Sequence, residues 1–61
     1  MKVFDGEKDR HTLRLILQMG IPIQYAYKEE PDHWDDCGNP NPPNNTSDHW
    51  PYSNKWYRIK P

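Results

Sequence analysis

The last six residues of the chain, Trp-Tyr-Arg-Ile-Lys-Pro, constrain its fold more than any other segment. Residues 56–60 alternate with the period of a strand, which puts Tyr57 and Ile59 on one face and their neighbours on the other. Chain ends are usually polar and frayed, so a terminal strand is useful only where it completes a sheet. We therefore expect a small sheet closed by its C-terminal strand, in a domain that is complete as given.

The core of such a sheet has to be built mainly from aromatic side chains. The 61 residues include nine Leu, Ile, Val and Phe residues in total, beside three Trp and four Tyr. A chain of this length forms one domain and buries only about 60% of the surface that its unfolded form exposes. Because each large aromatic side chain can bury about 150–250 Å², we expect Tyr25, Trp34 and Tyr57 to lie in the core.

A helix is predicted over residues 6–19. Its apolar stripe has helical spacing and comprises Leu13, Ile16 and Leu17. Asp5 precedes the helix as an expected N-cap. Gly20 occupies the position of a left-handed C-terminal residue, and Pro22 prevents the helix from continuing.

Three strands are predicted, at residues 21–27, 33–37 and 55–60, with a long loop at 38–47 that is rich in Pro and Asn. In the first strand, Ile23, Tyr25 and Tyr27 share a face that excludes Gln24 and Ala26. The fold class is therefore α+β, with one N-terminal helix packed on a small, mostly antiparallel sheet of about three strands.

One group of residues has the donor atoms of a metal site: His33, Cys37 and His49, with Asp35, Asp36 or Asp48 as a further ligand. The spacing matches no standard zinc motif, so we expect no metal and no cofactor. Cys37 follows two acidic residues, which disfavours a reactive thiolate, and no catalytic motif is recognisable. We therefore expect Cys37 to be a small buried apolar residue, and the protein not to be an enzyme.

A second group combines rings with positive charge and supplies the predicted ligand-binding residues: Trp50, Tyr52, Trp56, Arg58 and Lys60. An aromatic ring can stack on a base, and a neighbouring cation can pair with a phosphate. The alternative is that these rings simply belong to the core. We expect Trp50, Tyr52 and Trp56 to be exposed or at an interface.

Charge and composition narrow the partners. Eight Lys and Arg residues are spread among nine Asp and Glu residues, which disfavours stable binding to a nucleic-acid duplex. No segment approaches the length of an apolar membrane span, and a single cysteine fits a reducing compartment. Because a sheet with a helix on one face leaves aromatic residues exposed on the other, we expect a homo-oligomer, a dimer.

Several short motifs follow one another along the chain: a helical segment at 13–20, Ile-Gln-Tyr at 23–25, Trp-Asp-Asp-Cys at 34–37, Asn-Pro at 39–40, Trp50, and Tyr-Arg-Ile-Lys-Pro at 57–61. In this order they resemble small accessory proteins of tailed bacteriophages and prophages. The segment from Asn39 to Ser47 is longer than the Asn-Pro-x-Trp connection usual in those proteins. The resemblance implies a phage gene expressed in the host bacterial cytoplasm. It implies no reaction, because those proteins mostly lack an assigned activity.

These observations lead us to expect a non-enzymatic phage or prophage protein that acts on the host. The aromatic and basic C-terminal segment and the long polar loop favour counter-defence by sequestering a small nucleotide-derived immune signal. The alternative is an inhibitor that binds a host protein directly through residues 39–50. A third class, a small metal-dependent or nucleic-acid-processing enzyme, is disfavoured by the charge, the spacing and the lack of a motif.

Overall fold

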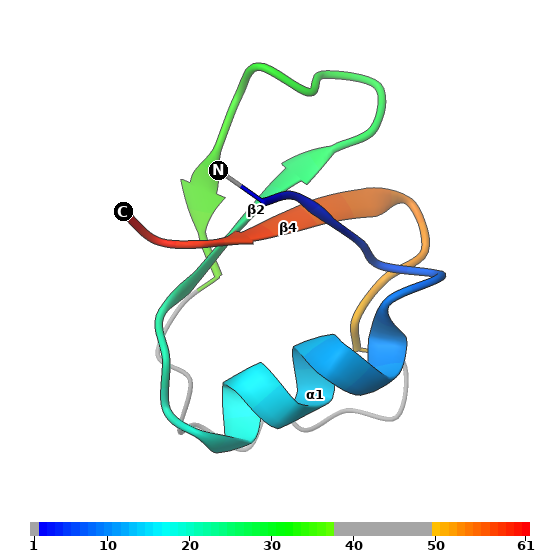
Figure 1. The fold of residues 1–61 in the computed structure, drawn as a ribbon. Coiled ribbons are helices and arrows are strands. Elements are labelled where there is room, and N and C mark those ends of the chain that lie inside the picture. Colours follow the sequence, from blue (N-terminus) through cyan, green and yellow to red (C-terminus); the bar gives the residue numbers. More distant parts are fainter. Residues whose placement is uncertain (1, 38–49) are drawn as a thin grey trace.

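The computed structural model describes residues 2–37 and 50–61. The fold is α+β, as predicted, with one helix on an antiparallel four-stranded sheet (Figure 1). Its elements are β1 (Phe4–Asp5), α1 (Arg10–Gln18), β2 (Ile23–Tyr27), β3 (Asp35–Asp36) and β4 (Lys55–Ile59). The strand order is β1-β4-β2-β3, so the C-terminal strand lies inside the sheet. The predicted loop at 38–47, with Asp48 and His49, lies outside the described residues.

The central pair of strands, β2 and β4, determines which side chains share a face. Tyr25 pairs with Tyr57 and Ala26 pairs with Trp56. The face that carries Tyr25 and Tyr57 packs against α1 and is called the inner face below. The opposite face, called the outer face, carries Ala26, Trp56 and Arg58. The predicted alternation in both strands is therefore confirmed.

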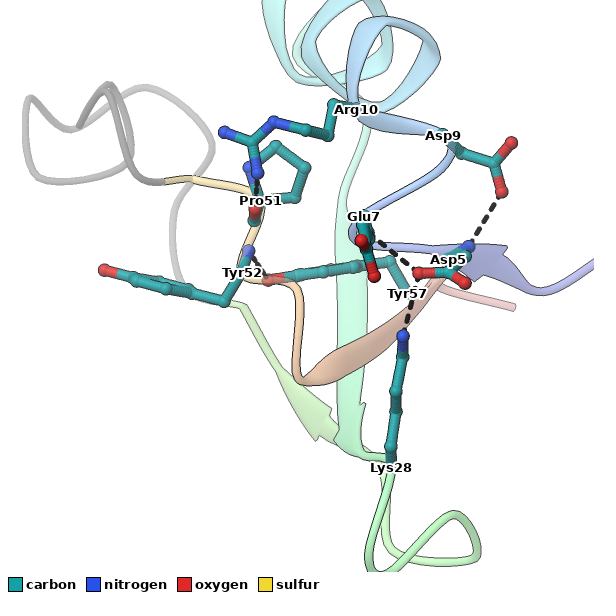
Figure 2. Close-up of polar contacts among 8 residues, drawn as sticks. All are labelled: Asp5, Glu7, Asp9, Arg10, Lys28, Pro51, Tyr52 and Tyr57. Atoms are coloured by element: carbon teal, nitrogen blue, oxygen red, sulfur yellow. Dashed lines mark hydrogen bonds and ion pairs between the residues drawn. The ribbon is translucent and has the colours of Figure 1, made fainter.

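Helix α1 begins at Arg10, later than the predicted start at residue 6. The Asp5 carboxylate does not cap it, because that group accepts a hydrogen bond from the Glu7 N–H at 2.8 Å. The Asp5 N–H donates to Asp9 Oδ2, also at 2.8 Å (Figure 2). These local contacts stabilise a turn between β1 and α1, and the turn takes up the residues in which the helix was expected to start.

The C-terminal end of α1 follows the prediction. Gly20 has a φ of 75°, a left-handed conformation that glycine adopts without steric cost. The Gly20 N–H donates to the Leu17 carbonyl at 3.0 Å, and the Ile21 N–H donates to the Ile16 carbonyl at 3.4 Å. This pair of bonds is a Schellman motif, which satisfies carbonyls that the helix would otherwise leave unpaired.

The core lies between α1 and the inner face. Its buried residues are Phe4, Leu13, Leu17, Ile23, Trp50 and Tyr57, against which Ile16, Tyr25 and Cys37 pack partly buried. The Tyr57 side chain is 1% exposed, and its hydroxyl accepts a hydrogen bond from the Tyr52 N–H at 2.9 Å (Figure 2). Burial raises the pKa of Tyr57 far above its usual range, so the phenol stays neutral and accepts this bond.

Three expected positions are wrong. Trp50 was expected to be exposed, but it is 3% exposed and packs edge-on against Tyr57, with ring centroids 5.4 Å apart. A core with so few aliphatic side chains is filled by this large ring. Ile59 was expected in the core, but it is 42% exposed because it is the last residue of β4. Trp34 was also expected in the core, but it is half-buried and outside the core cluster.

Gly6 allows β1 and the segment before β4 to approach closely. Its N–H donates to the Lys55 carbonyl at 3.0 Å. A Cβ at this position would lie 2.0 Å from the Tyr52 carbonyl oxygen and 2.9 Å from Tyr57 Cε2. The turn after β1 therefore requires a residue without a side chain.

Candidate ligand-binding face

The five predicted ligand-binding residues lie in three different places. Trp56, Arg58 and Lys60 alternate along β4 and the residue after it, and they share the outer face as predicted. Tyr52 is exposed, as predicted, but it belongs to a cluster on the inner face. Trp50 is buried in the core. Only the first three residues can form one ligand-binding surface.

On the outer face, Trp56 is paired with a lysine from the end of β2. The Lys28 Nζ atom lies over the Trp56 ring, 4.8 Å from its centroid. The same ammonium forms an ion pair with Asp5 Oδ1 at 2.9 Å (Figure 2). The hydrogen bond from Lys28 and that from the Glu7 N–H hold the pKa of Asp5 below its ordinary value. Lys28 is thus held beside the ring at neutral pH.

Trp34 forms a second pair of the same kind. The Arg58 guanidinium carbon lies 4.2 Å from the Trp34 ring centroid. Arg58 Nε also donates to Gln24 Oε1 at 2.9 Å. Arg58 therefore reaches from β4 across β2 to the ring that precedes β3. Trp34 was not among the predicted ligand-binding residues, because a strand of two residues has no periodicity that could assign Trp34 to a face.

The end of the outer face near Lys60 is polar. Lys60 Nζ lies 3.2 Å from Asp36 Oδ2, and Gln24 Nε2 donates to Asp36 Oδ1 at 3.1 Å. The hydrogen bonds from Gln24 and Lys60 lower the pKa of Asp36. This lysine and this aspartate are exposed, so an anionic ligand can compete with the carboxylate for the ammonium.

Ala26 lies between the two tryptophans. It pairs with Trp56 in β4, and the register of β2 with β3 continues to place Trp34 on its other side. Ala26 is 1% exposed although it belongs to the outer face, so neighbouring side chains of that face cover it. We call Trp34, Trp56, Lys28, Arg58 and Lys60 the aromatic–cation cluster.

The inner face carries a different group at its end. Lys55 Nζ lies over three tyrosine rings, 4.4 Å from the centroid of Tyr25, 5.0 Å from that of Tyr27 and 4.7 Å from that of Tyr52. Tyr27 and Tyr52 are exposed. The ammonium of the chain itself occupies the centre of this cluster, which therefore has its cation already.

The residues once considered for metal binding or catalysis form no such centre in the described part of the chain. Within residues 2–37 and 50–61, no three His, Cys, Asp or Glu side chains gather as metal ligands. His33 Nε2 lies 3.3 Å from Asp35 Oδ2 on the surface. Burial raises the pKa of the Cys37 thiol, against smaller opposing effects of Trp50 and Lys55. Cys37 packs against the core as a small apolar residue, as predicted.

The shape of the described residues favours binding on an open face. Residues 2–37 and 50–61 enclose no pocket, and α1 covers only the inner face of the sheet. The aromatic–cation cluster offers two rings for stacking and three cations for anionic groups. Chemically, this arrangement can hold a planar, negatively charged molecule.

Comparison with known proteins assigns no family: no family model, curated protein or solved structure matches the chain. In the part of the chain that the structure describes, no helix has the length and apolar character needed to cross a membrane.

Proposed function

We propose that this protein is a non-enzymatic binding protein, encoded by a phage or prophage, that sequesters a small nucleotide-derived immune signal in the host bacterial cytoplasm. The observation that supports ligand binding is the aromatic–cation cluster on the open face of the sheet. The proposed phage origin rests on the resemblance of the motifs that end in Tyr-Arg-Ile-Lys-Pro.

A nucleotide can replace the internal contacts of the cluster with stronger ones. At an exposed site a cation–π contact stabilises by about 0.5–1 kcal/mol, whereas stacking of a base on an aromatic side chain contributes roughly 1–3 kcal/mol. A base that displaces Arg58 from Trp34 leaves the guanidinium available for a phosphate, with which it forms bidentate, charge-assisted hydrogen bonds. The exchange therefore favours the nucleotide over the unliganded arrangement.

The three cations of the cluster give the ligand its charge preference. Lys28 and Lys60 already have carboxylate partners, at 2.9 Å and 3.2 Å. The Arg58 contacts described above are with neutral groups, Gln24 and the Trp34 ring. We therefore assign the main phosphate contact to Arg58, with Lys28 and Lys60 in supporting positions.

Calorimetry against cyclic nucleotides and ADP-ribose derivatives tests this function. Trp56→Ala and Arg58→Ala should each weaken binding by about 1–3 kcal/mol, while circular dichroism shows that both variants stay folded. Tyr27→Ala removes an exposed ring from the inner face and should leave the affinity unchanged. Absence of binding across the panel would contradict the proposal, and so would an equal loss in all three variants.

The alternative, direct inhibition of a host protein through residues 39–50, lies almost entirely outside the described residues. Its described end, Trp50, is buried. Native mass spectrometry of protein from infected cells separates the two functions, because it detects a retained small molecule, a bound host protein and the proposed homodimer in one measurement. Recovery of a host protein without a nucleotide would favour the alternative.

A further inference from the structure

We infer that the outer face accepts a ligand with two bases joined through phosphate, a dinucleotide, in preference to a mononucleotide. This inference rests on the proposed function and specifies the class of ligand. The observation that leads to it is that the outer face has two ring–cation pairs, Trp56 with Lys28 and Trp34 with Arg58. One base occupies a single ring, so a mononucleotide leaves half of the cluster unused.

The spacing of the two rings determines the form of the ligand. Trp56 belongs to β4 and Trp34 adjoins β3, and β2 lies between these strands. Neighbouring strands lie about 4.8 Å apart, so the two backbones are separated by roughly 10 Å. Bases stacked on each other lie about 3.4 Å apart. The two bases of the ligand must therefore be splayed, as in the recognition of single-stranded nucleotides on aromatic side chains.

Between the rings, the outer face provides room for a linking phosphate. Ala26 is the smallest residue of this face between Trp34 and Trp56, and it carries no group that would repel an anion. Arg58 extends from β4 over β2 toward Trp34, which places its guanidinium between the two strands that carry the rings. A phosphate that joins two bases, one on each ring, lies within reach of this guanidinium.

The charges at the two ends of the face add a further preference. Lys28 is paired with Asp5 at one end, and Lys60 is paired with Asp36 at the other. These carboxylates repel additional phosphates at the ends of the ligand. A dinucleotide with its charge at the centre, beside Arg58, therefore fits the face better than one with terminal phosphates.

Calorimetry of the intact protein tests the inference with three probes: AMP, the linear dinucleotide ApA and cyclic di-AMP. We expect at least one dinucleotide to bind ten-fold or more tightly than AMP. Trp34→Ala should remove this advantage and change the AMP affinity by no more than about two-fold, because AMP can still stack on Trp56. Tyr27→Ala, on the inner face, should preserve the full difference between the probes.

The outcomes separate this inference from the proposed function. If AMP binds as tightly as both dinucleotides, the inference is wrong and the proposed function stands. If none of the probes binds, both fail. Should Trp34→Ala not fold, the comparison of the three probes on the wild-type protein still decides, and Trp34→Phe, which keeps a smaller ring, should reduce the dinucleotide advantage without abolishing it.

Discussion

The three tryptophans carry the same side chain and differ in their surroundings. Trp50 packs against Tyr57 in the core, whereas Trp34 and Trp56 lie on the outer face with a cation over each ring. Trp56 could be assigned to its face from the alternation of β4. Trp50 and Trp34 could not, because neither belongs to a segment with strand or helix periodicity. Their positions depend on tertiary packing.

Two isoleucines that pair across β2 and β4 provide a direct test of core membership. Ile23 is 3% exposed and Ile59 is 42% exposed. Ile23→Ala should therefore cost about 2–5 kcal/mol, whereas Ile59→Ala should cost less than about 1 kcal/mol. Urea denaturation of the two variants measures this difference. Equal losses would mean that the end of the sheet is as well packed as its middle.

Gly6 is the position most sensitive to an added methyl group. Gly6→Ala would bring a Cβ against the backbone carbonyls of Tyr52 and Lys55, so we expect a loss of about 3 kcal/mol or failure to fold. Gly20→Ala is the matched control, since its Cβ meets no atom within 4 Å and costs only the left-handed backbone strain, about 1–2 kcal/mol. Thermal unfolding compares the two variants, and a milder effect at position 6 would refute the close approach.

At the scale of elements, the C-terminal strand connects the rest of the sheet. β4 pairs with β1 on one side and with β2 on the other. The alternation of β2 and β4 and the end of α1 at Gly20 could be predicted from the chain, because each depends on local periodicity or backbone conformation. β1 and the late start of α1 could not be predicted in the same way. β1 has two residues, and the turn that follows it depends on hydrogen bonds of Asp5 and Asp9.

Deleting residues 57–61 should unfold the domain, because it removes Tyr57 from the core and leaves β1 and β2 without a partner between them. Deleting only residues 60 and 61 removes one backbone hydrogen bond to Pro22 and the surface ion pair to Asp36, and should leave the fold intact. Amide hydrogen exchange distinguishes the two truncations. Protection that persists without residues 57–61 would show that β4 is dispensable.

The contact between Asp5 and Lys28 should make stability depend on acidity. The ordinary pKa of the Asp5 carboxyl is 3.8, and the fold lowers it, so the unfolded chain takes up this proton first as the pH falls. The stabilisation is therefore present above about pH 4 and is lost as the pH falls through the folded pKa. Asp5→Asn and Lys28→Met should both flatten the fall of the urea midpoint between about pH 5 and pH 2. An unchanged slope in both variants would exclude this linkage.

At the scale of the whole molecule, the sheet separates two functions between its faces. The inner face holds α1 and the core, and the outer face presents the aromatic–cation cluster. This separation means that a ligand can bind without opening the core. The proposed site was partly predictable, since Trp56, Arg58 and Lys60 alternate along one segment. Trp34 and Lys28 join them only through the pairing of strands that are distant in sequence.

The most direct test of ligand binding on the outer face is the response of the three tryptophan indole N–H signals in a ¹H–¹⁵N NMR titration with the tightest-binding nucleotide. Trp34 and Trp56 lie on the outer face, and Trp50, which is 3% exposed on the opposite side of the sheet, serves as an internal reference. We expect the signals of Trp34 and Trp56 to shift with a common saturation curve while that of Trp50 stays in place. A shift of Trp50 with no change at Trp34 and Trp56 would contradict binding on this face.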